Sequence, residues 1–142
     1  MRFFIFLTLM LFGTASSADI LRDKDAVKQL VAKVMKSIGE GKTEEGLRFT
    51  KPYLIIPTSE FNVVLEKLKL QAPVIEQRFG KTIGVEKYKV EEAGESLMLV
   101  MYLQKYEKHL MRWKFYFYKT KEGWVLNTFD TDDNIRLMFK NG

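Results

Sequence analysis

The sequence predicts an α+β domain in which N-terminal helices pack on a curved antiparallel sheet of four to five strands. Three observations predict this class. Apolar residues recur at three- and four-residue spacing in the N-terminal half, bulky rings alternate with polar residues at a spacing of two in residues 112–118, and glycine and proline separate the segments. Because residues 19–142 contain no internal repeat, low-complexity tract or linker, we expect them to form one domain.

The first predicted helix covers residues 19–38. Its apolar positions fall on one face, as an amphipathic helix requires, and comprise Val27, Leu30, Val31, Val34, Met35 and Ile38. Gly39 and Gly41 follow, and glycine accepts the left-handed conformation that commonly ends a helix. We therefore expect the helix to stop there with its apolar stripe buried.

Two further helices are predicted before the sheet. Thr43 has the side chain to cap a short helix that Pro52 stops, because the residue before a proline is biased away from helical geometry. Thr58 is expected to cap a third helix that reaches Gly80. Pro73 lies inside this third helix, and we expect it to kink or break the helix because proline lacks a backbone N–H.

An edge strand and a central strand are predicted next. Residues 85–92 alternate weakly and carry lysines on one side, which is typical of an edge strand that avoids further pairing. Residues 97–104 are apolar on both faces and are therefore expected at the centre of the sheet. The turn after them is poorly specified, so the sequence leaves open whether Leu99 or Val100 shares a face with Trp113.

The hairpin that follows is the best-specified part of the sheet. Bulky rings alternate with polar side chains over residues 112–118, and residues 120–123 suit a type I turn closed by a left-handed glycine, which pairs Thr120 with Trp124. Counting outward gives the remaining pairs: Phe117 with Asn127, Phe115 with Phe129, Lys114 with Asp130, Trp113 with Thr131 and Arg112 with Asp132. The two opposite-charge pairs support this register, although each is worth only about 0.2–1 kcal/mol.

The residues at the end of the sheet have a weaker signal. Ile135, Leu137 and Phe139 alternate, which leaves a last short strand and a tail laid against the sheet both open. Before them, oxygen-bearing side chains occupy positions 130 and 132–134. This group lacks the glycine and the glutamate that a calcium loop needs. We assign it to cross-strand pairing and strand termination, and we predict no metal site.

Residues 1–18 have the pattern of a cleaved secretory signal. The positive residue Arg2 precedes an apolar stretch over residues 3–12, and small residues lead to the expected cleavage site after Ala18. The apolar stretch is too short to span a bilayer, which takes roughly 20 residues. We therefore expect a periplasmic or secreted protein without a stable membrane anchor. The alternative is an uncleaved interfacial anchor.

The composition excludes several classes of function. The absence of cysteine removes disulfides, thiolate metal sites and cysteine nucleophiles. The net charge is +5, and the lysines are interspersed with acids, so we expect no nucleic-acid partner. The only histidine, His109, lies in or beside a predicted turn and is expected to be solvated. No residue pattern calls for a cofactor.

Four segments carry a resemblance to a known family: residues 51–53 before the third helix, 78–81 at its end, and 112–119 and 123–127 in the hairpin. With the element order, they make the chain resemble the nuclear transport factor 2-like superfamily, most closely its small exported bacterial members of unassigned function. The resemblance covers nearly all of residues 19–142 and implies a cone, in which a curved sheet wraps a long helix and leaves a pocket at the wide end. Relatives include ketosteroid isomerases, scytalone dehydratases and association domains, so the resemblance implies a fold and no particular activity.

The aromatic face of the sheet is expected to line this pocket. The predicted lining residues are Tyr53, Tyr102, Trp113, Phe115, Asn127 and Phe129. Asn127 is the one polar residue on this face, and it either orients a ligand carbonyl or satisfies a backbone group or a buried water. An isomerase or dehydratase needs an inward carboxylate, and this face holds none.

The opposite face is expected to form a contact surface. Its predicted residues are Arg112, Tyr116, Tyr118, Trp124 and Leu126. Tyrosine, tryptophan and arginine are enriched at the centres of interfaces, and the resemblance implies a homodimer through the sheet. The alternative is that the C-terminal segment, with Leu137 and Phe139, covers this patch within one chain.

These observations favour a small exported binding or accessory module without catalysis. It would hold a small apolar ligand in its pocket or a protein partner on its sheet. The first alternative is a pocket enzyme of isomerase or dehydratase type. The second is a structural homodimer.

Overall fold

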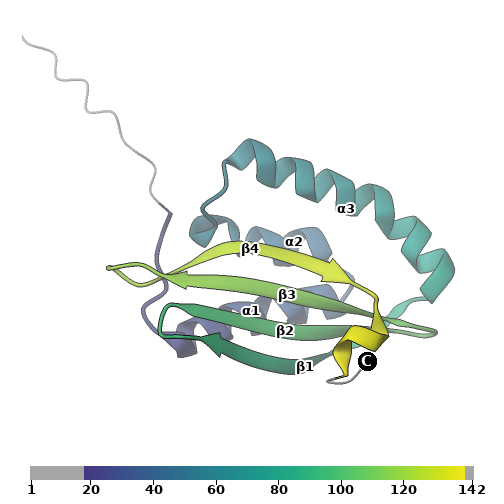
Figure 1. Cartoon of the computed structure of the whole chain (residues 1–142). Coiled ribbons are helices and arrows are strands. Elements are labelled where there is room, and N and C mark those ends of the chain that lie inside the picture. The colour runs from purple at the N-terminus through teal and green to yellow at the C-terminus, as the bar shows by residue number, and fades with distance from the viewer. Residues whose placement is uncertain (1–17, 140–142) are drawn as a thin grey trace, which may run out of the picture.

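Helices precede strands along the chain in the computed structural model, which describes residues 18–139 (Figure 1). The elements are α1 (Lys24–Gly39), α2 (Thr43–Arg48), the 3-10 helix η1 (Lys51–Tyr53), α3 (Thr58–Phe79), β1 (Thr82–Ala93), β2 (Leu97–Tyr106), β3 (Leu110–Lys119), β4 (Trp124–Asp132) and the 3-10 helix η2 (Ile135–Met138). The predicted signal segment, except for Ala18, lies outside the described residues.

The four strands form one open antiparallel sheet in the order β1-β2-β3-β4. The α+β class is therefore confirmed, with β1 at the edge and β2 inside as predicted. In Figure 1, α1 and α2 lie behind the sheet and η2 lies in front of it. We call the face packed against α1 the inner face and the other the outer face.

The core lies between α1 and the inner face. The predicted stripe of α1 is buried, and it packs in one cluster with residues of β2 and β3: Met98, Val100, Tyr102, Trp113, Phe115 and Phe117. The β2–β3 register places Tyr102 opposite Trp113 and Val100 opposite Phe115, which settles that Val100 shares the face of Trp113. Burial of each large apolar side chain contributes about 1.5–3 kcal/mol, so this cluster is the main source of stability.

The observed N-terminal caps of the helices differ from the predicted ones. Asp23 caps α1, because its Oδ1 accepts a hydrogen bond from the Ala26 backbone N–H at 2.8 Å. Neither predicted threonine acts as a cap: Thr43 and Thr58 are the first residues of α2 and α3, and no side chain caps either helix. Two residues that cap poorly, Lys42 and Pro57, occupy the cap positions instead.

Pro73 does not break α3, which continues from Thr58 to Phe79. The missing N–H deprives the Lys69 carbonyl of its helical partner. The residues around Pro73 are exposed, so water can replace that hydrogen bond. Of the two expected outcomes, the break was wrong, because the local cost of proline is offset by contacts at the two ends of α3.

The β3–β4 register is confirmed in one half of the hairpin and wrong in the other. The pairs Phe115–Phe129, Lys114–Asp130, Trp113–Thr131 and Arg112–Asp132 form as predicted. The register then shifts between Tyr116 and Phe117, so that Phe117 lies opposite Leu126 and Lys119 opposite Trp124. Asn127 is the extra residue of this bulge, and one extra residue exchanges the faces of every residue between it and the turn.

The bulge moves three predicted site residues. Trp124 is 3% exposed and Leu126 0% exposed, and both belong to the core cluster instead of the outer face. Asn127 is exposed and does not intrude among the rings. Leu126 also forms an isolated parallel β-bridge with Leu54. Trp124 and Leu126 are thus buried on the same face as Phe117.

The turn itself requires its glycine. Gly123 has φ 155°, and its carbonyl oxygen accepts a hydrogen bond from the Thr120 backbone N–H at 2.7 Å. A Cβ on Gly123 would lie 2.6 Å from the Leu21 carbonyl oxygen. Leu21 pairs with Trp124 at this point, so the chain entering α1 packs against the hairpin turn.

Candidate functional site

A cavity of about 470 Å³ lies between α3, the α1–α2 corner and the inner face of β2 and β3. Its walls are formed mainly by apolar and small residues of three regions: Gly39, Gly41 and Leu47 near the corner, Leu65, Leu68, Ala72 and Ile75 on α3, and Met111 and Trp113 on β3. This volume falls within the range of about 300–1,000 Å³ that is usual for small-molecule sites.

The cavity exists because α3 is held at its ends. Phe61 and Leu65 pack into the core near the start of α3, and Phe79 is buried at its end. There the β2–β3 turn fastens the helix, since the Lys108 N–H donates to the Phe79 carbonyl at 2.8 Å. Between these anchors Leu68 and Ala72 line the cavity.

A fixed chain of hydrogen bonds forms the polar part of the cavity wall. The Trp113 indole N–H donates to Gln104 Oε1 at 2.9 Å, and Gln104 Nε2 donates to Thr82 Oγ1 at 2.9 Å. Gln104 is 4% exposed, and all three residues line the cavity. Because the indole nitrogen is a donor only, it determines which end of the Gln104 amide faces it.

Tyr106 lines the cavity beside this chain. It lies opposite Thr82 in the β1–β2 ladder, and its ring meets Phe79 edge-on with centroids 5.5 Å apart. Burial raises the pKa of Tyr106 to about 12, and the hydroxyl of Thr82 opposes part of this rise. The phenol therefore stays protonated at neutral pH and is a hydrogen-bond donor.

Charged side chains surround the opening. Lys69 of α3 lies 3.7 Å from Glu44 of α2, and Glu44 is also paired with Arg48 at 2.7 Å. The hydrogen bond from Arg48, followed by the charge of Lys69, lowers the pKa of Glu44. Glu40, Glu76 and Lys81 complete the charged rim. These pairs link α2 to α3 across the opening, although exposed ion pairs contribute little to stability.

The predicted pocket residues are only partly brought together. Trp113 lines the cavity. Tyr102 and Phe115 are buried in the core, and Tyr53 and Phe129 pack against it. Asn127 instead borders a shallow depression that also includes Tyr116 and Tyr118. The polar residues that do line the cavity were missed: Thr82, Gln104 and Tyr106.

One signal for the missed residues was available. Gln104 is the only amide side chain in the largely apolar run of β2 and lies an even number of positions from Val100. Once Val100 is known to face inward, alternation puts Gln104 and Tyr106 on the same face. The poorly specified turn after β2 hid this, because the face of Val100 could not be assigned.

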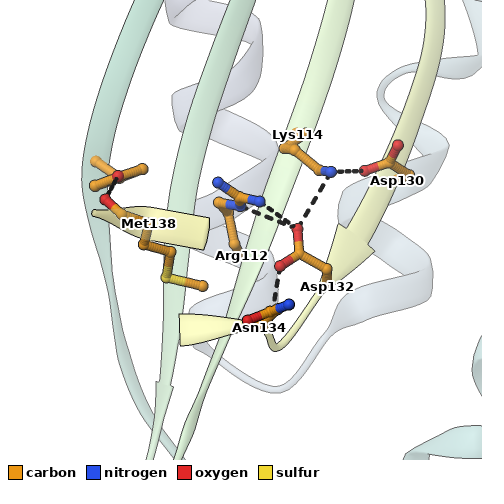
Figure 2. Close-up of polar contacts among 7 residues, drawn as sticks. Arg112, Lys114, Asp130, Asp132, Asn134 and Met138 are labelled. Carbon is orange, nitrogen blue, oxygen red and sulfur yellow. Dashed lines mark hydrogen bonds and ion pairs between the residues drawn. The ribbon is translucent and has the colours of Figure 1, made fainter. Parts of the chain in front are cut away.

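The outer face differs from the predicted contact surface (Figure 2). Arg112 is buried, and its Nη2 lies 2.8 Å from Asp132 Oδ2. Lys114 bridges Asp130 at 2.9 Å and Asp132 at 3.2 Å. The predicted cross-strand pairing is thus confirmed as one network. Tyr116 and Tyr118 lie on this face, but Trp124 and Leu126 do not, so the predicted surface loses its apolar centre.

The C-terminal segment lies against the outer face as a tail. Its residues form η2, and the Tyr88 hydroxyl of β1 donates a hydrogen bond to the Met138 carbonyl. Of the two alternatives for this segment, the tail is confirmed and the strand is wrong. Leu137 and Phe139 remain 60% and 69% exposed, so they do not themselves cover the aromatic patch.

His109 lies at the β2–β3 turn, as expected, but it is not freely solvated. Its Nε2 lies 3.3 Å from Asp133 Oδ2, and its ring meets Phe79 edge-on with centroids 4.5 Å apart. The histidine therefore helps to join the turn, the end of α3 and the segment after β4. This is a structural contact, since neither partner lines the cavity.

Within residues 18–139, no group of three or more acidic or histidine side chains is placed to hold a metal ion. None of the helices in the same span is long and apolar enough to cross a membrane. Comparisons of the chain with protein-family models, curated proteins and solved structures found no match.

Proposed function

We propose that this protein is a small exported binding domain that holds an apolar ligand in the cavity beneath α3. The observation that carries the proposal is the cavity itself, with apolar residues on α3 and β3 and a hydrogen-bonded polar wall at Gln104. Few, fixed polar groups within a mostly apolar wall are the usual arrangement of small-molecule sites. The export part of the proposal rests on the signal-like residues 1–18.

The proposed fold family is the nuclear transport factor 2-like superfamily. Three helices followed by an antiparallel sheet, with the longest helix beside the cavity, support this proposal. The sheet is open, and the cone of that superfamily is the finer part of the proposal.

The position and the pKa of the glutamates that line the cavity favour binding without catalysis. Glu40 and Glu76 are exposed and Glu44 is partly exposed at the rim, whereas Gln104 of the polar wall is buried. The pKa of Glu44 is lowered by its pairing with Arg48. A general base works best with a pKa near the working pH, which for a carboxyl group requires a raised pKa. We therefore do not extend the proposal to an isomerase or dehydratase.

A pair of substitutions on α3 tests the proposal. Leu68 lines the cavity, whereas Leu70, two residues later, is 77% exposed. Leu68→Trp places an indole in the cavity, and Leu70→Trp makes the same chemical change in solvent. The probe is the neutral fluorophore N-phenyl-1-naphthylamine, titrated into each purified protein after its thermal unfolding has been checked.

The wild type and Leu70→Trp are expected to bind the probe alike, and Leu68→Trp to bind it at least roughly tenfold more weakly, because the indole occupies the apolar volume. Equal binding by the two variants would reject the cavity as the site. So would a wild type that does not bind the probe at all.

A further inference from the structure

The hydrogen bonds of the cavity wall run in one direction. The Trp113 N–H donates to the Gln104 oxygen, and the Gln104 amide nitrogen donates to the Thr82 oxygen. A hydroxyl that accepts a hydrogen bond still has its own proton to donate. The Thr82 proton is therefore available to the next acceptor along the wall.

That next group is the Tyr106 hydroxyl. Tyr106 lies directly opposite Thr82 in the ladder, and both residues line the cavity. The chain of donors thus ends on an O–H of a residue that lines the cavity, and a ligand that meets it there must supply an acceptor.

The charges near this end of the cavity disfavour an anion. Gly39 and Gly41 at the end of α1 and Gly80 at the end of α3 all line the cavity, and a helix C-terminus carries a partial negative charge. Of the rim side chains, Lys69 is already engaged by Glu44. Glu44 is also paired with Arg48, so the side-chain charges around the opening balance, and the two helix ends are left to disfavour an anion.

The apolar part of the cavity is elongated. Its α3 wall extends from Leu65 to Ile75, which corresponds to roughly 15 Å at the helical rise per residue. We propose that the Tyr106 hydroxyl donates a hydrogen bond to a neutral acceptor, such as an alcohol or ester oxygen, at one end of an elongated apolar ligand. This inference rests on the proposed function and adds the ligand class and the residue that recognises it.

Competition against N-phenyl-1-naphthylamine tests the ligand class. The competitors are 1-decanol, methyl decanoate and decanoate, which share a chain and differ in the polar end. The two neutral compounds are expected to displace the probe at roughly tenfold lower concentration than decanoate, because the negative ends of α1 and α3 oppose the carboxylate. Decanoate that binds as tightly as 1-decanol would overturn the neutral class.

Tyr106→Phe tests the recognition residue, and Tyr102→Phe is its matched control. Both tyrosines lie on β2, but Tyr102 is in the core and does not line the cavity. Tyr106→Phe is expected to lower the affinity for 1-decanol about three- to tenfold, the usual effect of losing one neutral hydrogen bond. Binding of the fluorescent probe, which lacks an oxygen acceptor, is expected to stay the same in both variants.

The outcomes separate this inference from the proposed function. If Leu68→Trp abolishes probe binding while Tyr106→Phe binds 1-decanol as well as the wild type, the cavity stands and the role of Tyr106 is rejected. A wild type that binds neither the probe nor any competitor rejects both.

Discussion

Helices α1 and α3 pack on the same face of the sheet, yet they relate to it in opposite ways. All along its length α1 buries apolar side chains in the core cluster, and it lies closest to β1 and β2. The longer α3, of 22 residues, buries only Phe61, Leu65 and Phe79, all close to its ends. The difference teaches that α1 builds the core, whereas the middle of α3 is free to form one wall of a cavity.

The largest expected effect tests the two helices directly. Ile38 of α1 is fully buried, and Leu70 of α3 is exposed. Ile38→Ala is expected to lower the free energy of unfolding by about 2–5 kcal/mol, because it leaves a cavity in the core. Leu70→Ala is expected to change it by no more than about 0.5 kcal/mol. Urea unfolding of both variants measures the contrast, and similar losses would remove the distinction between the helices.

A smaller loss of stability is expected from a substitution on the outer face of the sheet, opposite the face on which α1 and α3 lie. Asp132→Asn weakens the charged hydrogen bonds to Arg112 and Lys114, which should cost about 1.5–3 kcal/mol of unfolding free energy. Thr128→Asn, at an exposed position on the same strand, is the control. Binding of N-phenyl-1-naphthylamine at neutral pH should not change in either variant, because neither position lines the cavity.

The same network gives a pH dependence. Burial acts to raise the pKa of Asp132, but the hydrogen bonds from Arg112 and Lys114 outweigh it, and the pKa is lowered. Its stabilisation is therefore present above the pKa of an unfolded aspartate, about 3.9, and is lost as pH falls through the folded-state value. Between pH 6 and pH 3 the wild type should lose more stability than Asp132→Asn. Parallel pH profiles would contradict this.

The smallest effect is expected at the rim between α2 and α3. Glu44 is exposed, and its pairs with Arg48 and Lys69 are screened by solvent. Glu44→Gln should leave the midpoint of urea unfolding unchanged, both at low salt and at high salt. A clear loss at low salt would mean that these ion pairs, and not the packed ends of α3, hold the helix in place.

The core helix α1 and part of the β3–β4 hairpin were predictable, because the sequence patterns that specify them are local. The stripe of α1 and the pairing of Phe115 with Phe129 follow from spacing in the sequence. The bulge at Asn127 was not predictable, since an extra residue in a strand is fixed by what its neighbours contact. Leu126 pairs with Leu54, far away in the sequence, and this contact keeps it in the core.

The candidate site was harder to predict because it depends on contacts between distant segments. The position of α3 is set by Phe61 in the core and by the hydrogen bond from Lys108 to Phe79, and neither contact has a sequence signature. The polar wall depends on the face of Gln104, which the unspecified turn after β2 left open. Sequence therefore located Trp113 but not the polar residues beside it.

The most direct test of the central claim is hydrogen exchange of the wild type with and without N-phenyl-1-naphthylamine. Without the probe, amides 66–76 of α3 should exchange faster than those of α1, because few buried contacts hold the middle of α3. Saturating probe should slow exchange in that segment and leave α1 unchanged. Protection confined to the outer face, or equal protection of both helices before the probe is added, would contradict the account.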